Sequence, residues 1–115
     1  PMHFEVSNVL FKFDSAVLSE EGHAILEDVA DWCHMNRDLP HLIVSGHTDN
    51  VGTTGYNIDL SQRRSAAVAD ALRNLNVRQE ITAQGLGESD PIQSNESEAG
   101  RAANRRVSFE FTKAP

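Results

Sequence analysis

Asp49 and Arg64 are the charged residues whose positions best suggest a binding site for a small ligand. Asp49 comes just after the apolar stretch 42–46, where a strand would end, and Arg64 lies fifteen positions further on in a helical pattern. A carboxylate accepts hydrogen bonds from an ammonium group, and a guanidinium can donate two parallel hydrogen bonds to a carboxylate. The two side chains therefore predict a clamp for a ligand that carries both charges.

Arg64 falls on the inward stripe of its predicted helix. Leu60, Arg64 and Val68 recur at four-residue steps, so they share one face. A buried guanidinium is costly unless its charge is paired or hydrogen-bonded. One interpretation is an internal ion pair with Asp49 or with another acid such as Asp14. The other is a position near the helix start where the guanidinium is offered to an anionic ligand group.

The loop before this helix supplies further hydrogen-bonding groups. Residues 49–55 include two glycines and two threonines, and the helix start that follows has backbone N–H groups that favour a carboxylate. Asn57 is either a cap or a ligand contact, and Asp49 is also a candidate for an Asx-turn that only shapes the loop. One acid, one base and several amide donors suit an amino-acid-like zwitterion better than a phosphate or a sugar alone.

The composition indicates one domain. The chain has 115 residues with 39% apolar content, enough to bury a core without metals or disulfides. Ten basic and 17 acidic residues give a net charge of −7, which argues against nucleic acid or an anionic membrane surface as the main partner. Cys33 is the single cysteine, and no apolar run is long enough to span a membrane. The abrupt start at Pro1 suggests an excised domain of a longer protein or a mature chain.

Hydrophobic periodicity predicts two main helices among four strands. Ser19 is the expected N-cap of the first helix, whose buried stripe includes Trp32 and Cys33, and Pro40 should end it near residues 36–38. Residues 1–8 are expected to be a loosely attached leading segment. The expected strands are Val9–Phe13, Leu42–Gly46, Ile81–Gly87 and Arg105–Thr112, the second helix runs from about 56–59 to about 74, and residues 101–104 form a short turn.

The order of these elements predicts an α+β fold. The second strand, the second helix and the third strand form a crossover unit, which should be right-handed with parallel strands. The last strand follows a longer connection and is expected to pair antiparallel. The expected β-α-β-α-β-β architecture is a mixed four-stranded sheet with both main helices packed on one face.

The sequence offers little support for catalysis or for a metal site. The five histidines are scattered, with no pair at i, i+4 and no cysteine at ligand spacing. There is no nucleophile-elbow, GxGxxG or Walker sequence, and the neighbouring His47 and Asp49 suggest hydrolase chemistry only weakly. Cys33 on the buried stripe is expected to be an inert core residue, and no metal or other cofactor is expected.

Four stretches of the chain carry a family pattern. They are VLFKFDSAVLSEEG, GHTDNVGTTGYNIDLSQRRSAAVADAL, QGLGESDPI and GRAANRRVSFEF, which cover nearly the whole chain from about Val9 to Phe111. In this order they resemble the OmpA-like domain, the peptidoglycan-associating module of outer-membrane proteins, Pal lipoproteins and flagellar stator proteins. The resemblance implies the β-α-β-α-β-β fold, no catalysis, and binding of the peptide stem of peptidoglycan through its diaminopimelate residue.

The resemblance also implies roles for individual residues. Asp49 resembles the position that takes the free ammonium at the amino-acid end of diaminopimelate, and Arg64 resembles the position that takes the carboxylate there. Thr48 and Asn57 match supporting ligand-contact positions, and Leu60 matches a hydrophobic position beside the pocket.

Three further positions are weaker candidates for the site. Asn104 and Arg105 belong to the NRR motif and are expected to brace the site, although either one is a candidate for a ligand contact. Asp14 matches the FD at the first strand–loop junction of the family. Ser65 departs from the alanine that many relatives carry after the arginine, and serine is small enough that no loss is expected.

The resulting hypothesis is a non-catalytic wall-binding module in a Gram-negative periplasm. Its expected partner is the diaminopimelate-containing stem peptide; the parent protein is expected to be attached to the outer or inner membrane, and the domain itself should not insert. Because the net charge is −7, binding should depend on the local clamp rather than on bulk attraction to the anionic wall. The alternative is an interaction or scaffold domain of an envelope complex, with a vestigial site in which Asp49 and Arg64 pair with each other.

Overall fold

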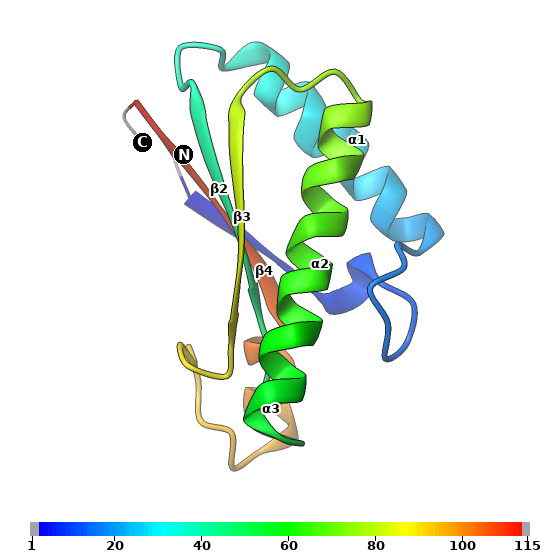
Figure 1. The fold of residues 1–115 in the computed structure, drawn as a ribbon, viewed down its shortest axis with the longest axis vertical. Coiled ribbons are helices and arrows are strands. Elements are labelled where there is room, and N and C mark those ends of the chain that lie inside the picture. Colours follow the sequence, from blue (N-terminus) through cyan, green and yellow to red (C-terminus); the bar gives the residue numbers. More distant parts are fainter. Residues whose placement is uncertain (1–2, 114–115) are drawn as a thin grey trace.

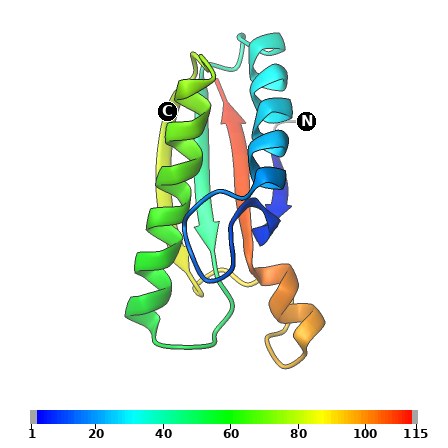
Figure 2. The same ribbon diagram turned by 90° about the vertical axis from the view of Figure 1, so that its right-hand side faces the viewer.

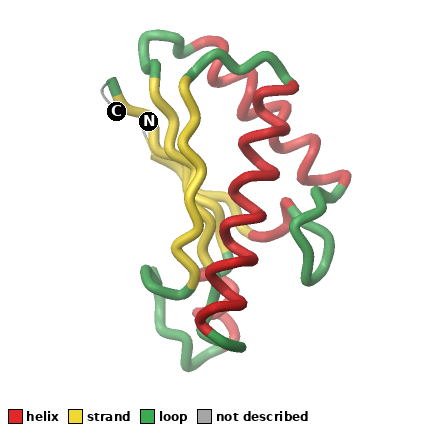
Figure 3. The backbone as a smooth tube through the Cα atoms, viewed as in Figure 1, coloured by secondary structure: helices red, strands yellow, loops and turns green. Residues whose placement is uncertain are grey.

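A four-stranded sheet that carries its main helices on one face forms the frame of the molecule (Figures 1 and 3). The computed structural model describes residues 3–113. Its elements are β1 (His3–Ser7), the 3-10 turn η1 (Asn8–Leu10), α1 (Glu20–Met35), β2 (His41–His47), α2 (Thr54–Asn74), β3 (Glu80–Gly87), α3 (Glu98–Asn104) and β4 (Arg106–Thr112). Within residues 3–113, no helix has the length and the apolar character needed to cross a membrane.

The strand order in the sheet is β1-β4-β2-β3, and the strand directions are mixed. β2 and β3 are parallel and are joined through α2, whereas β4 is antiparallel to both β1 and β2. The predicted mixed sheet with two main helices on one face is therefore confirmed. Figure 2 shows α1 and α2 side by side in front of the sheet.

The first strand lies earlier in the chain than the sequence predicts, so the prediction of a strand at Val9–Phe13 is wrong. Residues His3–Ser7 pair with β4 instead, and the ring of Phe4 stacks on that of Phe109 with 4.9 Å between their centroids. Both segments alternate apolar and polar residues, so periodicity alone does not choose between them. Pairing with β4 decides which segment becomes the strand, because Phe4 packs on the apolar surface of β4.

Residues 11–18 form an irregular loop in place of the predicted strand. Phe11 is buried and forms an isolated bridge with Leu18, whereas Phe13 is 98% exposed. The expectation of a loosely attached segment at 1–8 is also wrong for residues 3–8, and residues 1–2 lie outside the described part of the chain. In Figure 2 this loop passes in front of the sheet between α1 and α2.

Helix α1 begins at the predicted cap and buries the predicted stripe. The Oγ atom of Ser19 accepts a hydrogen bond from the backbone N–H of Gly22 at 2.9 Å. The ring of Trp32 packs against that of Phe111 with 4.6 Å between their centroids. Cys33 is fully buried, and burial raises the pKa of its thiol to about 11, so the thiol stays protonated at neutral pH.

Helix α2 begins slightly earlier than predicted, at Thr54. Its N-cap is Thr53, whose Oγ1 atom accepts a hydrogen bond from the backbone N–H of Tyr56 at 3.1 Å. The sequence offers two adjacent threonines at this point, and the hydroxyl of the first one sets the start of the helix.

Helix α2 lies very close to β2 and β3, and two glycines allow this approach. A Cβ atom at Gly46 would be 2.4 Å from the carbonyl oxygen of Ser61, and one at Gly85 would be 2.3 Å from the backbone nitrogen of Gln62. The same two helix residues accept hydrogen bonds from the edge strand β3. The N–H of Gly85 donates to Gln62 Oε1 at 2.9 Å and that of Gly87 donates to Ser61 Oγ at 3.0 Å. The helix is thereby fixed over the ends of the two strands.

Replacing Gly85 by alanine should lower the free energy of unfolding by about 1–3 kcal/mol, because the added methyl group forces α2 away from the sheet. Gly55→Ala is the matched control, since its Cβ atom would meet nothing within 4 Å. That variant should be unchanged or up to about 1 kcal/mol more stable. Urea unfolding followed by circular dichroism measures both changes, and equal stability of the two variants would contradict the close-packing argument.

Candidate functional site

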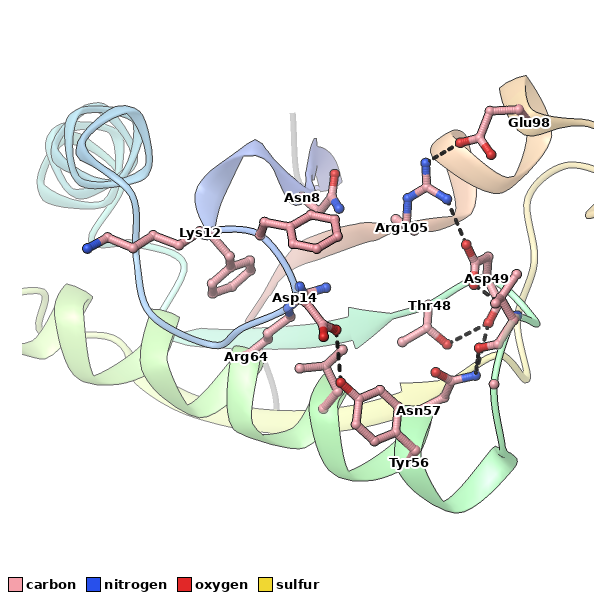
Figure 4. A pocket seen from close by; sticks show the side chains of 15 residues that line it. Asn8, Lys12, Asp14, Thr48, Asp49, Tyr56, Asn57, Arg64, Glu98 and Arg105 are labelled. Carbon is pink, nitrogen blue, oxygen red and sulfur yellow. Dashed lines mark hydrogen bonds and ion pairs between the residues drawn. The ribbon is translucent and has the colours of Figure 1, made fainter.

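The described residues line a cavity of about 680 Å³ at one end of the sheet (Figure 4). Its walls come from the loop 11–18, the segment after β2, the first turns of α2, and α3 with the residue that follows it. The lining residues are Asn8, Phe11, Lys12, Phe13, Asp14, Thr48, Asp49, Val51, Gly52, Tyr56, Asn57, Leu60, Arg64, Glu98 and Arg105. Seven of the eight predicted site residues are among them, and Asn104 is the exception.

Asp49 lies just beyond the end of β2. The N–H of Thr48 donates to the carbonyl oxygen of Gly87 at 2.8 Å, which extends the pairing of β2 with β3 beyond the strand end. Asp49 Oδ1 accepts from the N–H of Val51 at 3.0 Å, as in the expected Asx-turn, and Oδ2 accepts from Arg105 Nη1 at 2.7 Å. Each carboxylate oxygen has room for a second donor, so Asp49 can still receive an ammonium group.

Arg64 is only 7% exposed, and it is held by neutral partners. Its Nε–H donates to the carbonyl oxygen of Ser15 at 2.9 Å, and its guanidinium carbon lies 5.0 Å from the centroid of the Phe11 ring. Burial lowers the pKa of Arg64, and the nearby charge of Asp14 opposes this effect. The guanidinium remains charged at neutral pH.

The terminal nitrogens of Arg64 are available to a ligand. Nη1 and Nη2 have no hydrogen-bond partner among the described residues. Among the side-chain nitrogen and oxygen atoms of residues 3–113, the one that is both fully buried and without a hydrogen-bond partner belongs to His47. The unpartnered Nη atoms of Arg64 are therefore not fully buried. Arg64 lines the cavity, so its terminal nitrogens are candidates for binding a carboxylate there.

Asp49 and Arg64 face the same cavity without pairing with each other. Within the described residues, Asp49 has its ion pair with Arg105, and Arg64 has none. In Figure 4, Arg64 and Asp14 lie toward one end of the cavity, whereas Asp49 and Arg105 lie toward the other. This geometry corresponds to the interpretation in which Arg64 is offered to a ligand. The Arg64 guanidinium and the Asp49 carboxylate, the positive and the negative pole of the cavity, have separate partners.

The loop 11–18 contributes Asp14, a predicted candidate, and three lining residues that were not predicted. Asp14 has a positive φ of 50°, and its Oδ1 atom accepts a hydrogen bond from the hydroxyl of Tyr56 at 2.9 Å. That hydrogen bond is the main reason why the pKa of Tyr56 is raised. Phe11, Lys12 and Phe13 were overlooked as site residues because the segment was predicted as a strand.

Three of the predicted residues shape the cavity in different ways. Asn57 Nδ2 donates to the carbonyl oxygens of Val51 at 3.0 Å and of Asp49 at 3.3 Å, so it holds the loop after β2. The Thr48 hydroxyl donates to the carbonyl oxygen of Asp49 at 2.8 Å. Leu60 is buried and supplies an apolar part of the wall.

The two candidate site residues of the NRR motif, Asn104 and Arg105, lie in different surroundings. Arg105 lies at the cavity between Asp49 and Glu98, and the hydrogen bonds that it donates to these carboxylates, chiefly to Glu98, raise its pKa. Asn104 is fully buried outside the cavity, where its Oδ1 atom accepts from the N–H groups of Ile92 at 2.8 Å and Gln93 at 3.1 Å. Asn104 therefore braces the segment before α3. It does not line the cavity, so the cavity geometry does not support a ligand contact by Asn104.

His47 ends β2 on the face of the sheet opposite the helices. Its Nε2 atom is 3.2 Å from Ser108 Oγ, while its Nδ1 atom is buried without a partner among the described residues. Burial lowers the pKa of His47, with a further contribution from the charge of Arg106, and Asp90 and Glu5 oppose it. The imidazole is therefore kept neutral directly before the Thr48–Asp49 segment.

The lowered pKa of His47 predicts a loss of stability in mild acid. Above the ordinary pKa of 6.5, the neutral ring makes its full contribution to the free energy of unfolding. As the pH falls from there toward the lowered folded-state pKa, the unfolded chain takes up a proton before the folded chain does, and this contribution is lost. Urea unfolding between about pH 8 and pH 5 should therefore show a shallower pH dependence for His47→Gln than for the parent. His23→Gln, which replaces an exposed histidine, is the control, and equal slopes for all three proteins would contradict the assignment.

Comparisons with known proteins match this chain to outer membrane proteins. The sequence model described as "OmpA family" matches residues 10–105. Over 106 residues the chain is 39% identical to outer membrane protein A of Bordetella avium, covering 91% of this chain. The chain spans about half of that relative, 54% of its length, and 27% to 40% of further outer membrane protein A and porin F relatives.

Two solved structures share the fold at appreciable sequence identity. The peptidoglycan-associated lipoprotein of Burkholderia pseudomallei superposes with a TM-score of 0.78 at 32% identity, covering 94% of this chain and 89% of that one. The cell wall anchor of the T6SS from Pseudomonas aeruginosa superposes with a TM-score of 0.83 at 32% identity, covering 96% and 80%.

Proposed function

The chain belongs to the OmpA family, and we propose that it binds peptidoglycan through the diaminopimelate residue of the stem peptide. Such binding is non-covalent and non-catalytic, and it attaches an envelope protein to the cell wall from the periplasmic side. The names of two structural relatives, a peptidoglycan-associated lipoprotein and a cell wall anchor, support the wall as the partner.

The observation that carries this proposal is the separation of Asp49 from Arg64 across one cavity. Arg64 keeps both Nη groups without a partner among the described residues, and Asp49 keeps acceptor capacity beside Arg105. The free end of diaminopimelate carries an ammonium and a carboxylate on one carbon atom. The ammonium would bind Asp49 and the carboxylate would bind Arg64, which can donate two parallel hydrogen bonds.

The remaining walls suit the rest of such a ligand. Leu60 and the ring of Phe11 offer apolar surface beside the two charges, against which the methylene chain of diaminopimelate would pack. Thr48 and Asn57 are proposed to support ligand contacts by holding the loop after β2, and Asp14 is proposed to act near Arg64. The parent protein is proposed to be membrane-attached, with this domain in the periplasm.

Asp49→Asn and Arg64→Ala should each weaken binding of a diaminopimelate-containing muropeptide by about thirtyfold or more. Each change removes one partner of a charge pair formed in a desolvated cavity, which typically costs about 2 kcal/mol or more. Isothermal titration of the purified domain measures the dissociation constants, and circular dichroism checks that each variant is folded.

The chain offers matched controls for both changes. Asp59→Asn and Arg63→Ala alter the same residue types at exposed positions on α2, where the two side chains pair with each other at 2.8 Å. These variants should bind the muropeptide like the parent. If Asp49→Asn and Arg64→Ala also bind like the parent, the two-pole site is wrong.

A stem peptide with lysine in place of diaminopimelate should bind at least about tenfold more weakly than the natural peptide. Lysine keeps the ammonium but lacks the carboxylate, so Arg64 would lose its ligand partner. Competition against a labelled diaminopimelate peptide gives the ratio directly. Equal competition by both peptides would contradict the role proposed for Arg64.

The alternative function, a scaffold domain with a vestigial site, would be favoured by an ion pair between Asp49 and Arg64. Asp49 instead pairs with Arg105, and the cavity of about 680 Å³ lies between the two charges. The geometry therefore supports ligand binding better than the vestigial site.

A further inference from the structure

Glu98 reaches the proposed ligand site through Arg105. Glu98 stands in the first turn of α3 and Arg105 is the C-cap of the same helix. Arg105 Nη2 donates to Glu98 Oε1 at 2.6 Å, and its Nη1 donates to Asp49 Oδ2 at 2.7 Å. Figure 4 shows the Arg105 guanidinium between the two carboxylates. One planar group is thus held at both ends, which fixes its rotation and the position of Asp49.

The charges of this trio matter as much as its geometry. Asp49 and Arg105 alone would sum to zero, so an incoming ammonium would meet a carboxylate that is already neutralised. Glu98 restores a net charge of −1 to the group of three. The whole lining then balances, because three acids (Asp14, Asp49, Glu98) face three bases (Lys12, Arg64, Arg105). Without Glu98 the lining would carry a net charge of +1 and would favour simple anions over zwitterions.

We propose that Glu98 is a positioning residue that, by holding and neutralising Arg105, gives the cavity its preference for a ligand with an ammonium group at the Asp49 end. This proposal rests on the proposed function and concerns the same site. Glu98 also accepts from Arg101 Nε at 3.3 Å, so its carboxylate is held on the outer side of Arg105 and acts on the ligand indirectly. Its lowered pKa, caused chiefly by the hydrogen bond from Arg105, keeps it ionised at neutral pH.

The test compares Glu98→Gln with Glu96→Gln in the same domain. Both variants remove one exposed negative charge from neighbouring positions, but Glu96 does not line the cavity. The ligands are the tripeptide L-Ala-γ-D-Glu-diaminopimelate and the same peptide with the distal amino group acetylated. NMR titration is suited to both peptides, because it measures dissociation constants into the millimolar range.

Glu98→Gln should bind the unmodified tripeptide about two- to fivefold more weakly than the parent, the range expected for a partly screened charge. Glu96→Gln should match the parent. With the acetylated peptide, Glu98→Gln should bind at least as tightly as the parent, because the ammonium that senses Glu98 is gone and the remaining ligand charge is negative. A purely structural role for Glu98 would weaken both peptides alike.

The proposal is overturned if Glu98→Gln binds the tripeptide like Glu96→Gln, or if it loses affinity equally for both peptides. These results leave the proposed function standing whenever the parent binds the tripeptide. A parent that does not bind the tripeptide at all would overturn the proposed function, and the role of Glu98 with it.

Discussion

The close approach of α2 to β2 and β3 is the constraint on which the cavity depends. Gly46 and Gly85 leave no side chain between helix and sheet, and Ser61 and Gln62 bind the edge strand from the helix side. The next turn of the same helix carries Arg64 toward the loop 11–18. A helix displaced from the sheet would also shift Arg64 relative to that loop. The packing of α2 on the sheet and the position of Arg64 in the cavity therefore depend on each other.

The second requirement is that the two poles stay apart. Arg64 is stabilised by the carbonyl oxygen of Ser15 and the ring of Phe11 instead of a counter-ion, which leaves its terminal nitrogens unused within the described residues. Asp49 is satisfied by Arg105 and by a backbone N–H. Had the two charges paired directly, they would have filled the space that a zwitterion needs. Separate partners therefore preserve a site that direct pairing would have closed.

The sequence predicted what short-range patterns control and failed where distant partners decide. The Ser19 cap, the stripe that turns Arg64 inward and the strands β2 to β4 follow from local periodicity, and the family motifs singled out seven lining residues. The first strand was misplaced because its register is set by β4, about a hundred positions away. The partner of Asp49 was likewise missed, because Arg105 is 56 positions distant and only the folded chain brings it near.

The contrast between the acidic chain and its balanced cavity bears on how such a module would hold a wall. A net charge of −7 gives no long-range attraction to an anionic polymer, whereas the cavity lining pairs three acids with three bases. Under the proposed function, affinity would come from short-range fit to a zwitterion, which favours discrimination over fast capture. In a membrane-attached parent, tethering would supply a high effective concentration of binding sites near the wall. Weak but selective contacts would then suffice to hold the parent protein at the wall, without strong non-specific adhesion.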